Sequence, residues 1–262
     1  MKKAILVVSF GTNYAETRER TIGACENKIR EAFPDYDVYR AFTSNMVINK
    51  LAKRDGIHVD TVEVALLKLE SLGYEEVIIQ SLHIIHGEEY EKIITQAQSF
   101  QNKFSRLIIG EPLLQNYDDY VMTIAALVSQ MPVLQSDEAV VLMGHGTEHY
   151  SFSAYACLDH MLRDTPIYLG CVESYPSLDI IMAELEEDHK KKVHLMPFML
   201  VSGDHAINDM ASDNKDSWKT QLMGEGFETV CYLQGLGENP AIQAQFVNRI
   251  ARALEKEAVL HG

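Results

Sequence analysis

The sequence is short of both cysteine and positive charge. It has four cysteines in 262 residues, and they are scattered with no CxxC pair: Cys25, Cys157, Cys171 and Cys231. Such spacing argues against a zinc knuckle, a thioredoxin-like redox site and a disulfide framework. With 23 basic against 38 acidic residues the net charge is −15. We therefore expect no binding to nucleic acid or to an anionic membrane, although a locally basic cleft can still accept an anionic small molecule.

The sequence also lacks long apolar runs and the glycine signatures of nucleotide sites. No stretch approaches the roughly 20 apolar residues of a membrane span. The opening "MKKAILVVSFGTNY" has neither the long apolar region nor the cleavage site of a signal peptide, so a first strand in a cytoplasmic protein is expected. A GxxxxGK[ST] loop is absent, and the turns after both first strands lack GxGxxG. No nucleotide cofactor is therefore expected.

The two halves of the sequence resemble each other, which indicates an internal duplication. "AVVLMGHGT" (139–147) matches "AILVVSFGT" (4–12) in residue type and position. "VHLMPFMLVSGDHAIND" (193–209) lies over "VIIQSLHIIHGEEYEKI" (77–93) without a gap. A unit of half the chain indicates a duplicated domain rather than a solenoid. The turn-like "MPVLQSD" (131–137) separates the copies, which predicts an N-terminal domain over 1–134 and a C-terminal domain over 135–262.

Each half alternates apolar runs of strand length with segments of helical periodicity. The first half predicts strands at 4–10, 37–44, 77–85 and 106–113, with helices between them. Asn13 with Glu16, and Asp60 with Glu63, predict capping boxes at the starts of two of these helices. Near-continuous apolar strands are typical of parallel sheets covered on both faces. The prediction is an α/β protein of two similar doubly wound, flavodoxin-like domains.

Polar residues stand where three strands of the second half end. His145 follows the first strand, Glu173 the second and His205 the third, whereas Phe10 and Glu89 hold the places of His145 and His205 in the first half. Ligands of open α/β sheets bind outside the carboxyl ends of the strands. Two imidazoles and a carboxylate suit a divalent cobalt, iron, nickel or zinc ion. Three protein ligands leave open positions, which is typical of a site that exchanges its ion.

The same residues have structural interpretations, which the pattern by itself leaves open. A strand-end histidine is often a hydrogen-bonding group of the fold. Glu173 has the chemistry to cap the next helix or to pair with a lysine. Glu89 stands in the first turn of a predicted helix, where an acid complements the helix dipole.

Several longer motifs of the sequence indicate a family. "QSLHIIHGEEYEKI", "VVLMGHG", "VESYP", "LMPFMLVSGDHAINDMA" and "GLGENPAI" resemble the anaerobic cobalt chelatases of cobalamin biosynthesis, which are sirohydrochlorin cobaltochelatases of the class II chelatase family. The resemblance runs from about Lys2 to about Phe246. It implies a tetrapyrrole cleft between two α/β domains, with His145, Glu173 and His205 contacting the metal and Glu89 as an active-site acid facing them.

The resemblance also implies a reaction, the ATP-independent insertion of Co²⁺ into sirohydrochlorin or its oxidised precursor form. His145 and His205 would hold Co²⁺, with Glu173 completing a loose site. The two histidines and Glu89 would accept the pyrrole protons. His86 stands where related sequences often carry asparagine, and it offers an extra imidazole at the cleft mouth.

Other interpretations share the same residues. Fe²⁺ or Ni²⁺ suits the ligand set as well as Co²⁺, and a non-catalytic carrier of metal or tetrapyrrole would use the same cleft. Sirohydrochlorin is a polycarboxylate, so basic residues near the second strand are candidates for binding it: Arg40, Lys50, Lys53 and Arg54. A solvated helix face explains them equally well. The oligomeric state does not follow from the sequence.

Overall fold

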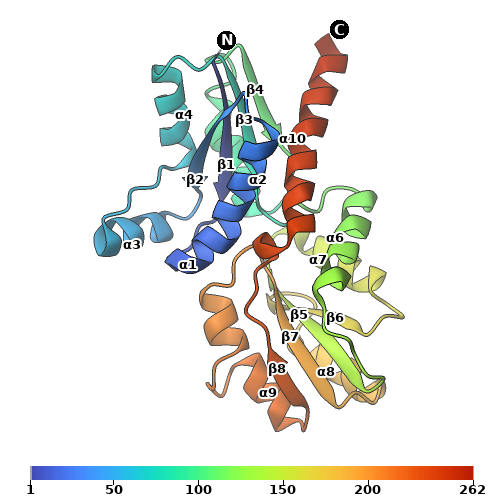
Figure 1. Cartoon of the computed structure of the whole chain (residues 1–262). Helices are drawn as coiled ribbons and strands as arrows, with labels where there is room; N and C mark the ends of the chain where they lie inside the picture. The colour runs from blue at the N-terminus through green and yellow to red at the C-terminus, as the bar shows by residue number, and fades with distance from the viewer. Residues whose placement is uncertain (1, 262) are drawn as a thin grey trace.

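Two lobes, each built on a four-stranded parallel sheet, make up the computed structural model, which describes residues 2–261 (Figure 1). The first half contains β1 (Lys3–Ser9), α1 (Ala15–Arg18), a π-helical turn (Glu19–Gly23), α2 (Ala24–Ala32), β2 (Asp37–Phe42), α3 (Asn45–Asp55), α4 (Val62–Ser71), β3 (Glu76–Ser81), α5 (Glu88–Gln98), β4 (Arg106–Gly110) and α6 (Tyr117–Gln130). The second half contains β5 (Glu138–Gly146), a 3-10 turn (Tyr150–Phe152), α7 (Ser153–Met161), β6 (Ile167–Glu173), α8 (Leu178–Glu187), β7 (Lys192–Phe198), a π-helical turn (His205–Met210), α9 (Trp218–Gly224), β8 (Glu228–Cys231), a 3-10 turn (Leu236–Glu238) and α10 (Pro240–His261).

The two sheets have the same topology. Their strand orders are β2-β1-β3-β4 and β6-β5-β7-β8, and every pairing is parallel. In both lobes the chain reverses its direction of sheet growth at the first strand, which is where a doubly wound sheet forms a ligand crevice. The predicted fold class, two similar doubly wound α/β units, is confirmed.

Strand β1 is apolar from Ala4 to Val8 because both faces of its sheet are covered. Ile5 and Val7 of β1 pack into one hydrophobic cluster, while Leu6 and Val8 pack into another. Side chains alternate across a strand, so a strand buried on both sides needs apolar residues at successive positions. The continuous run at 4–10 therefore reflects double burial.

The last helix of the chain crosses back to the first lobe. Figure 1 shows α10 (red) lying alongside α2 and β4, and α6 (green) lying beside the second lobe. The buried guanidinium of Arg249 on α10 pairs with the buried Asp119 carboxylate of α6 at 2.6 Å and donates to the Leu113 carbonyl. One hydrophobic cluster runs from Ile5 through Phe246 of α10 to Val140 of the second lobe. The lobes therefore share a core. The domain boundary at residue 134 stays a prediction.

The helix starts differ from the predicted capping boxes. α1 begins after Tyr14 without a side-chain cap, and the buried Asn13 side chain leaves its Oδ1 without a hydrogen-bond partner. The residue that caps α4 is Thr61 rather than Asp60; its hydroxyl accepts from the backbone of Val64 at 3.3 Å. Both predictions were wrong because the backbone enters each helix one residue later than predicted, so the N-cap positions are Tyr14 and Thr61. Among the described residues, no helix combines the length and the apolar character needed to cross a bilayer.

Candidate active site in the inter-lobe cavity

A cavity of about 380 Å³ lies between the two lobes, at the carboxyl ends of both central strands. Residues of both halves line it, with apolar walls that include Phe10, Leu82, Phe198 and Leu200. All four predicted site residues also line it: His145, Glu173, His205 and Glu89. The size and the mixture of apolar wall and few polar groups are typical of small-molecule sites.

The two glycines around His145 bring the ends of β5 and β6 together. Gly146 has φ +79, and a Cβ placed on it would lie 1.6 Å from the Glu173 carbonyl oxygen. A Cβ on Gly144 would lie 2.9 Å from the Tyr155 ring. Gly146 is paired in register with Glu173. Only glycine permits this backbone approach, and the approach places the His145 side chain next to that of Glu173.

The side chains of His145, Glu173 and His205, hereafter the His-Glu-His cluster, converge at the cavity. His145 Nδ1 lies 3.9 Å from a Glu173 carboxylate oxygen, and the His145 and His205 ring centroids are 4.7 Å apart, edge to face. Their exposed fractions are 45%, 54% and 38%, so an incoming ion can reach all three. Among residues 2–256, whose side chains the structure describes, no three His, Cys, Asp or Glu side chains already enclose a metal position. The metal-ligand roles therefore stay a prediction.

Hydrogen bonds set which imidazole nitrogen is available in the cluster. His205 Nδ1 lies 2.6 Å from an Asp209 carboxylate oxygen, and His145 Nδ1 lies 3.1 Å from the Gly146 carbonyl. These oxygens only accept, so Nδ1 is the donor in each ring, and Nε2 is the nitrogen without a hydrogen-bond partner in the cluster. Sequence reasoning missed Asp209. Its signal is a carboxylate four residues after a strand-end histidine, on the π-helical turn that begins at His205.

Glu89 contributes a carboxylate from the first lobe. It lies in the first turn of α5, as the helix-dipole interpretation expects, and one of its oxygens accepts from Lys92. Its other oxygen, Oε2, is buried without a hydrogen-bond partner among the described residues. A buried unpartnered carboxylate oxygen costs free energy, so it is a natural acceptor for a proton or an N–H group of a bound molecule.

Comparison with known proteins identifies the family. The family model for cobalt chelatase (CbiK) matches residues 3–255. The chain belongs to the cobalt chelatase family. It is 54% identical over 256 residues to the sirohydrochlorin cobaltochelatase of Salmonella typhimurium, covering 97% of both chains, and 36% identical over 242 residues to the sirohydrochlorin cobaltochelatase CbiKC of Nitratidesulfovibrio vulgaris, covering 90% and 85%. SirB from Bacillus subtilis, solved with Fe³⁺, aligns with TM-score 0.64 over 98% of each chain at 14% identity, which shows a shared fold.

In this cobalt chelatase a further histidine, His83, lines the cavity close after the end of β3. Its Nδ1 lies 2.9 Å from the Ser81 hydroxyl and its Nε2 3.5 Å from the Thr43 hydroxyl. Burial lowers the pKa of His83 to about 4; Glu89 opposes this shift and Lys92 adds to it. The ring is therefore neutral at ordinary pH. His83 falls within the strand that the sequence predicts over 77–85, but only the packing shows that its imidazole is held uncharged.

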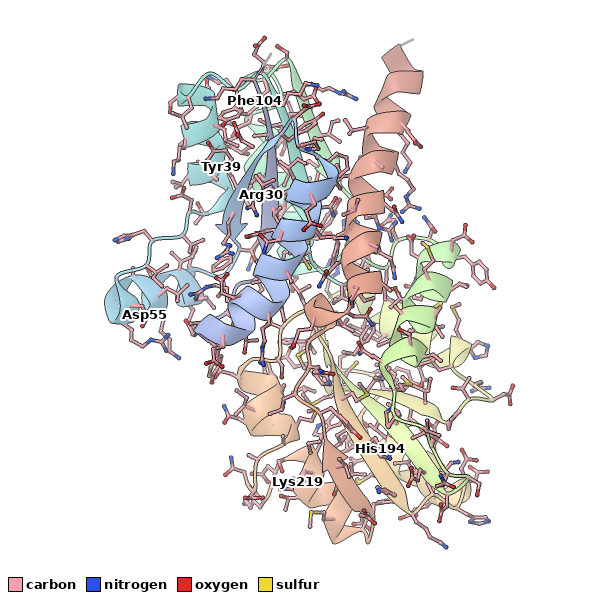
Figure 2. All side chains as sticks on the ribbon, viewed as in Figure 1. Arg30, Tyr39, Asp55, Phe104, His194 and Lys219 are labelled. Carbon is pink, nitrogen blue, oxygen red and sulfur yellow. The ribbon has the colours of Figure 1, made fainter. Side chains whose placement is uncertain are left out.

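His86, the residue that departs from related sequences, has a different position. Its ring packs edge-on against Tyr90 at 4.5 Å between centroids, and it is not among the residues lining the cavity. The imidazole that was predicted to lie at the cleft mouth therefore packs against Tyr90 of α5 and does not line the cavity. His194, by contrast, behaves as a core histidine of the chelatase: it is buried in the second sheet (Figure 2), with Nε2 3.1 Å from Glu138.

Polar contacts between the lobes flank the cavity of the chelatase. The Tyr14 hydroxyl donates to Asp204 at 2.6 Å, directly beside His205. This contact raises the pKa of Tyr14, chiefly because its hydroxyl proton is held by the Asp204 carboxylate. Elsewhere between the lobes, Glu91 of α5 accepts from the Tyr150 hydroxyl at 3.2 Å. These contacts hold the first-lobe residues of the site in register with the second-lobe residues.

The four basic candidates have separate environments in the structure. Arg40 donates to the Glu26 carboxylate through two nitrogens at 2.6 and 2.7 Å, so its positive charge is neutralised by a carboxylate of the first lobe. The guanidinium of Arg54 is held by Asp55 and by the Asn13 carbonyl. Lys50 and Lys53 are exposed on α3.

Proposed function

We propose that this family member inserts Co²⁺ into sirohydrochlorin, with the His-Glu-His cluster receiving the ion and Glu89 receiving a proton. The supporting observation is that metal-ligand groups from the second lobe and an unpartnered acceptor from the first line one cavity. The relatives at 54% and 36% identity carry the name of this activity.

The exchange has a simple balance. One divalent ion enters the ring, and two pyrrole N–H protons leave it. Nε2 of His145, Nε2 of His205 and the Glu173 carboxylate bind Co²⁺ as it sheds water, with Asp209 orienting the His205 ring. The half-exposed, loosely spaced cluster suits transient binding, because an ion held in a closed site would not pass to the tetrapyrrole.

The protons need acceptors that are uncharged or anionic before transfer. Glu89 Oε2 takes one pyrrole proton, since it is buried without another partner. A cluster imidazole takes the second once its Nε2 has released the ion. The apolar walls around Phe10 and Phe198 pack against the ring faces and exclude water from the transfer.

The activity is tested by mixing the protein with Co²⁺ and sirohydrochlorin and following the absorption spectrum of the metallated ring. Many equivalents of product per protein support the enzyme, whereas a shift that stops at one equivalent would mean a carrier. Running Fe²⁺ and Ni²⁺ in parallel measures metal preference.

Single replacements His145→Ala and His205→Ala locate the chemistry within the cavity. Both side chains are partly exposed, one at the carboxyl end of β5 and one on the turn that begins at His205, so we expect unfolding free energies within about 1 kcal/mol of wild type. Insertion should be lost in both. His58→Ala, a replacement of an exposed histidine outside the cavity lining, is the control. Wild-type rates in either cluster variant would remove the proposed role of the cluster.

A further inference from the structure

A groove on the surface of α3 continues outward from the inter-lobe cavity. It has a volume of about 490 Å³ and is lined by Met46, Asn49, Lys50, Lys53 and Arg54. Met46 also lines the cavity, so the two spaces meet at its side chain. Met46 is 67% exposed, which leaves an apolar surface at this junction.

The groove side of α3 has unneutralised positive charge. Lys50 and Lys53 are exposed, and among the side chains that the structure describes, those of residues 2–256, neither has a carboxylate within ion-pairing distance. Other basic groups nearby are paired: Arg40 with Glu26, and Lys92 with Glu89. Free lysines at the mouth of a cavity are distinctive in a chain of net charge −15.

The helix presents these groups on one side and holds them firmly. Met46, Lys50 and Lys53 follow at steps of four and three residues, which is the spacing of one helix face. α3 is capped at its start by the Ser44 hydroxyl, which accepts from the Val47 backbone at 3.3 Å, and it ends at Gly56 in the left-handed conformation. Its outer end, marked by Asp55, stands away from both sheets in Figure 2.

We infer that Lys50 and Lys53 form a carboxylate-binding subsite for the side chains of the tetrapyrrole ring, an inference that rests on the proposed function. The macrocycle lies in the cavity with an edge at Met46, and the acetate and propionate groups of that edge extend into the groove. Lysine suits this task because a flexible stem with a compact charge can follow flexible carboxylates, whereas a guanidinium fork demands fixed geometry.

The test is the double replacement Lys50→Gln and Lys53→Gln in the full chain. Sirohydrochlorin binding is titrated without metal by fluorescence, and kcat and KM for Co²⁺ insertion are measured over a series of salt concentrations. We expect Kd and KM to rise roughly fivefold, the factor that two exposed ion contacts supply. We expect kcat to stay at the wild-type value, and the salt dependence of KM to flatten.

Lys190→Gln with Lys191→Gln is the matched control. It removes the same charge directly before the amino end of β7, which is the opposite end of the strand from the cavity. It should leave Kd and KM unchanged. Wild-type Kd and KM in the α3 variant, or an equal rise in the control, would overturn the subsite. Wild-type protein that binds the ring without inserting metal would instead contradict the proposed function and leave the binding result valid.

Discussion

The neutral state of His83 leads to a prediction about stability and pH. Burial lowers the pKa of His83 to about 4, whereas an unfolded histidine titrates near about 6.5. Between these two pKa values, His83 is protonated in the unfolded chain and unprotonated in the folded chain. Stability must therefore fall as the pH falls through this window, and it is unaffected by His83 above it. The linkage relation gives a loss of roughly 2 kcal/mol from this one residue between pH 7 and pH 5.

His83→Gln isolates that contribution. The amide of glutamine can still bond to the Ser81 and Thr43 hydroxyls, but it does not titrate. Urea unfolding followed by circular dichroism gives the free energy of unfolding of both proteins at pH 7 and pH 5. The value at pH 7 sets the baseline for any packing lost in the variant. We expect the wild type to lose about 2 kcal/mol more than the variant on acidification. Equal losses would refute the reasoning, because they would mean that the folded protein protonates His83 without penalty.

Three further replacements test the positioning of the site. Asp209→Asn removes the charge that orients His205, so Co²⁺ affinity measured by calorimetry should fall at least about tenfold; an unchanged affinity would count against this support. Gly146→Ala should destabilise the fold by about 2 kcal/mol or more in urea unfolding and slow insertion, since its Cβ would overlap the Glu173 carbonyl; wild-type stability would contradict the required approach. Glu89→Gln should lower kcat about a hundredfold with Co²⁺ affinity kept, and a kcat near wild type would exclude Glu89 as the acceptor.

Much of the architecture follows from local pattern. The apolar runs at 4–10 and 139–147 predicted matching first strands of the two halves, and β1 and β5 hold the same internal place in equivalent sheets. The gapless overlay of 77–93 on 193–209 predicted equivalent strands followed by Glu89 and His205, and both residues line the same cavity. This succeeds because a parallel sheet places the carboxyl ends of its strands on one edge, so strand-end residues gather there in any doubly wound domain.

Other parts of the site depend on contacts that no local pattern encodes. The pairing of His205 with Asp209, the half-buried and uncharged His83 and the bond from Tyr14 to Asp204 each arise from the final packing. The packing of α10, the last helix of the chain, against the first lobe likewise arises only in the tertiary structure. An amphipathic helix has one periodicity whichever sheet it covers, so the sequence does not show on which lobe it packs. The sequence alone determined the strands and the polar residues at or after their carboxyl ends. Only the tertiary structure decided which side chains meet across the cavity and which charges remain unpaired beside it. The reason is that hydrogen bonds and pKa values depend on distance and burial in a shared core.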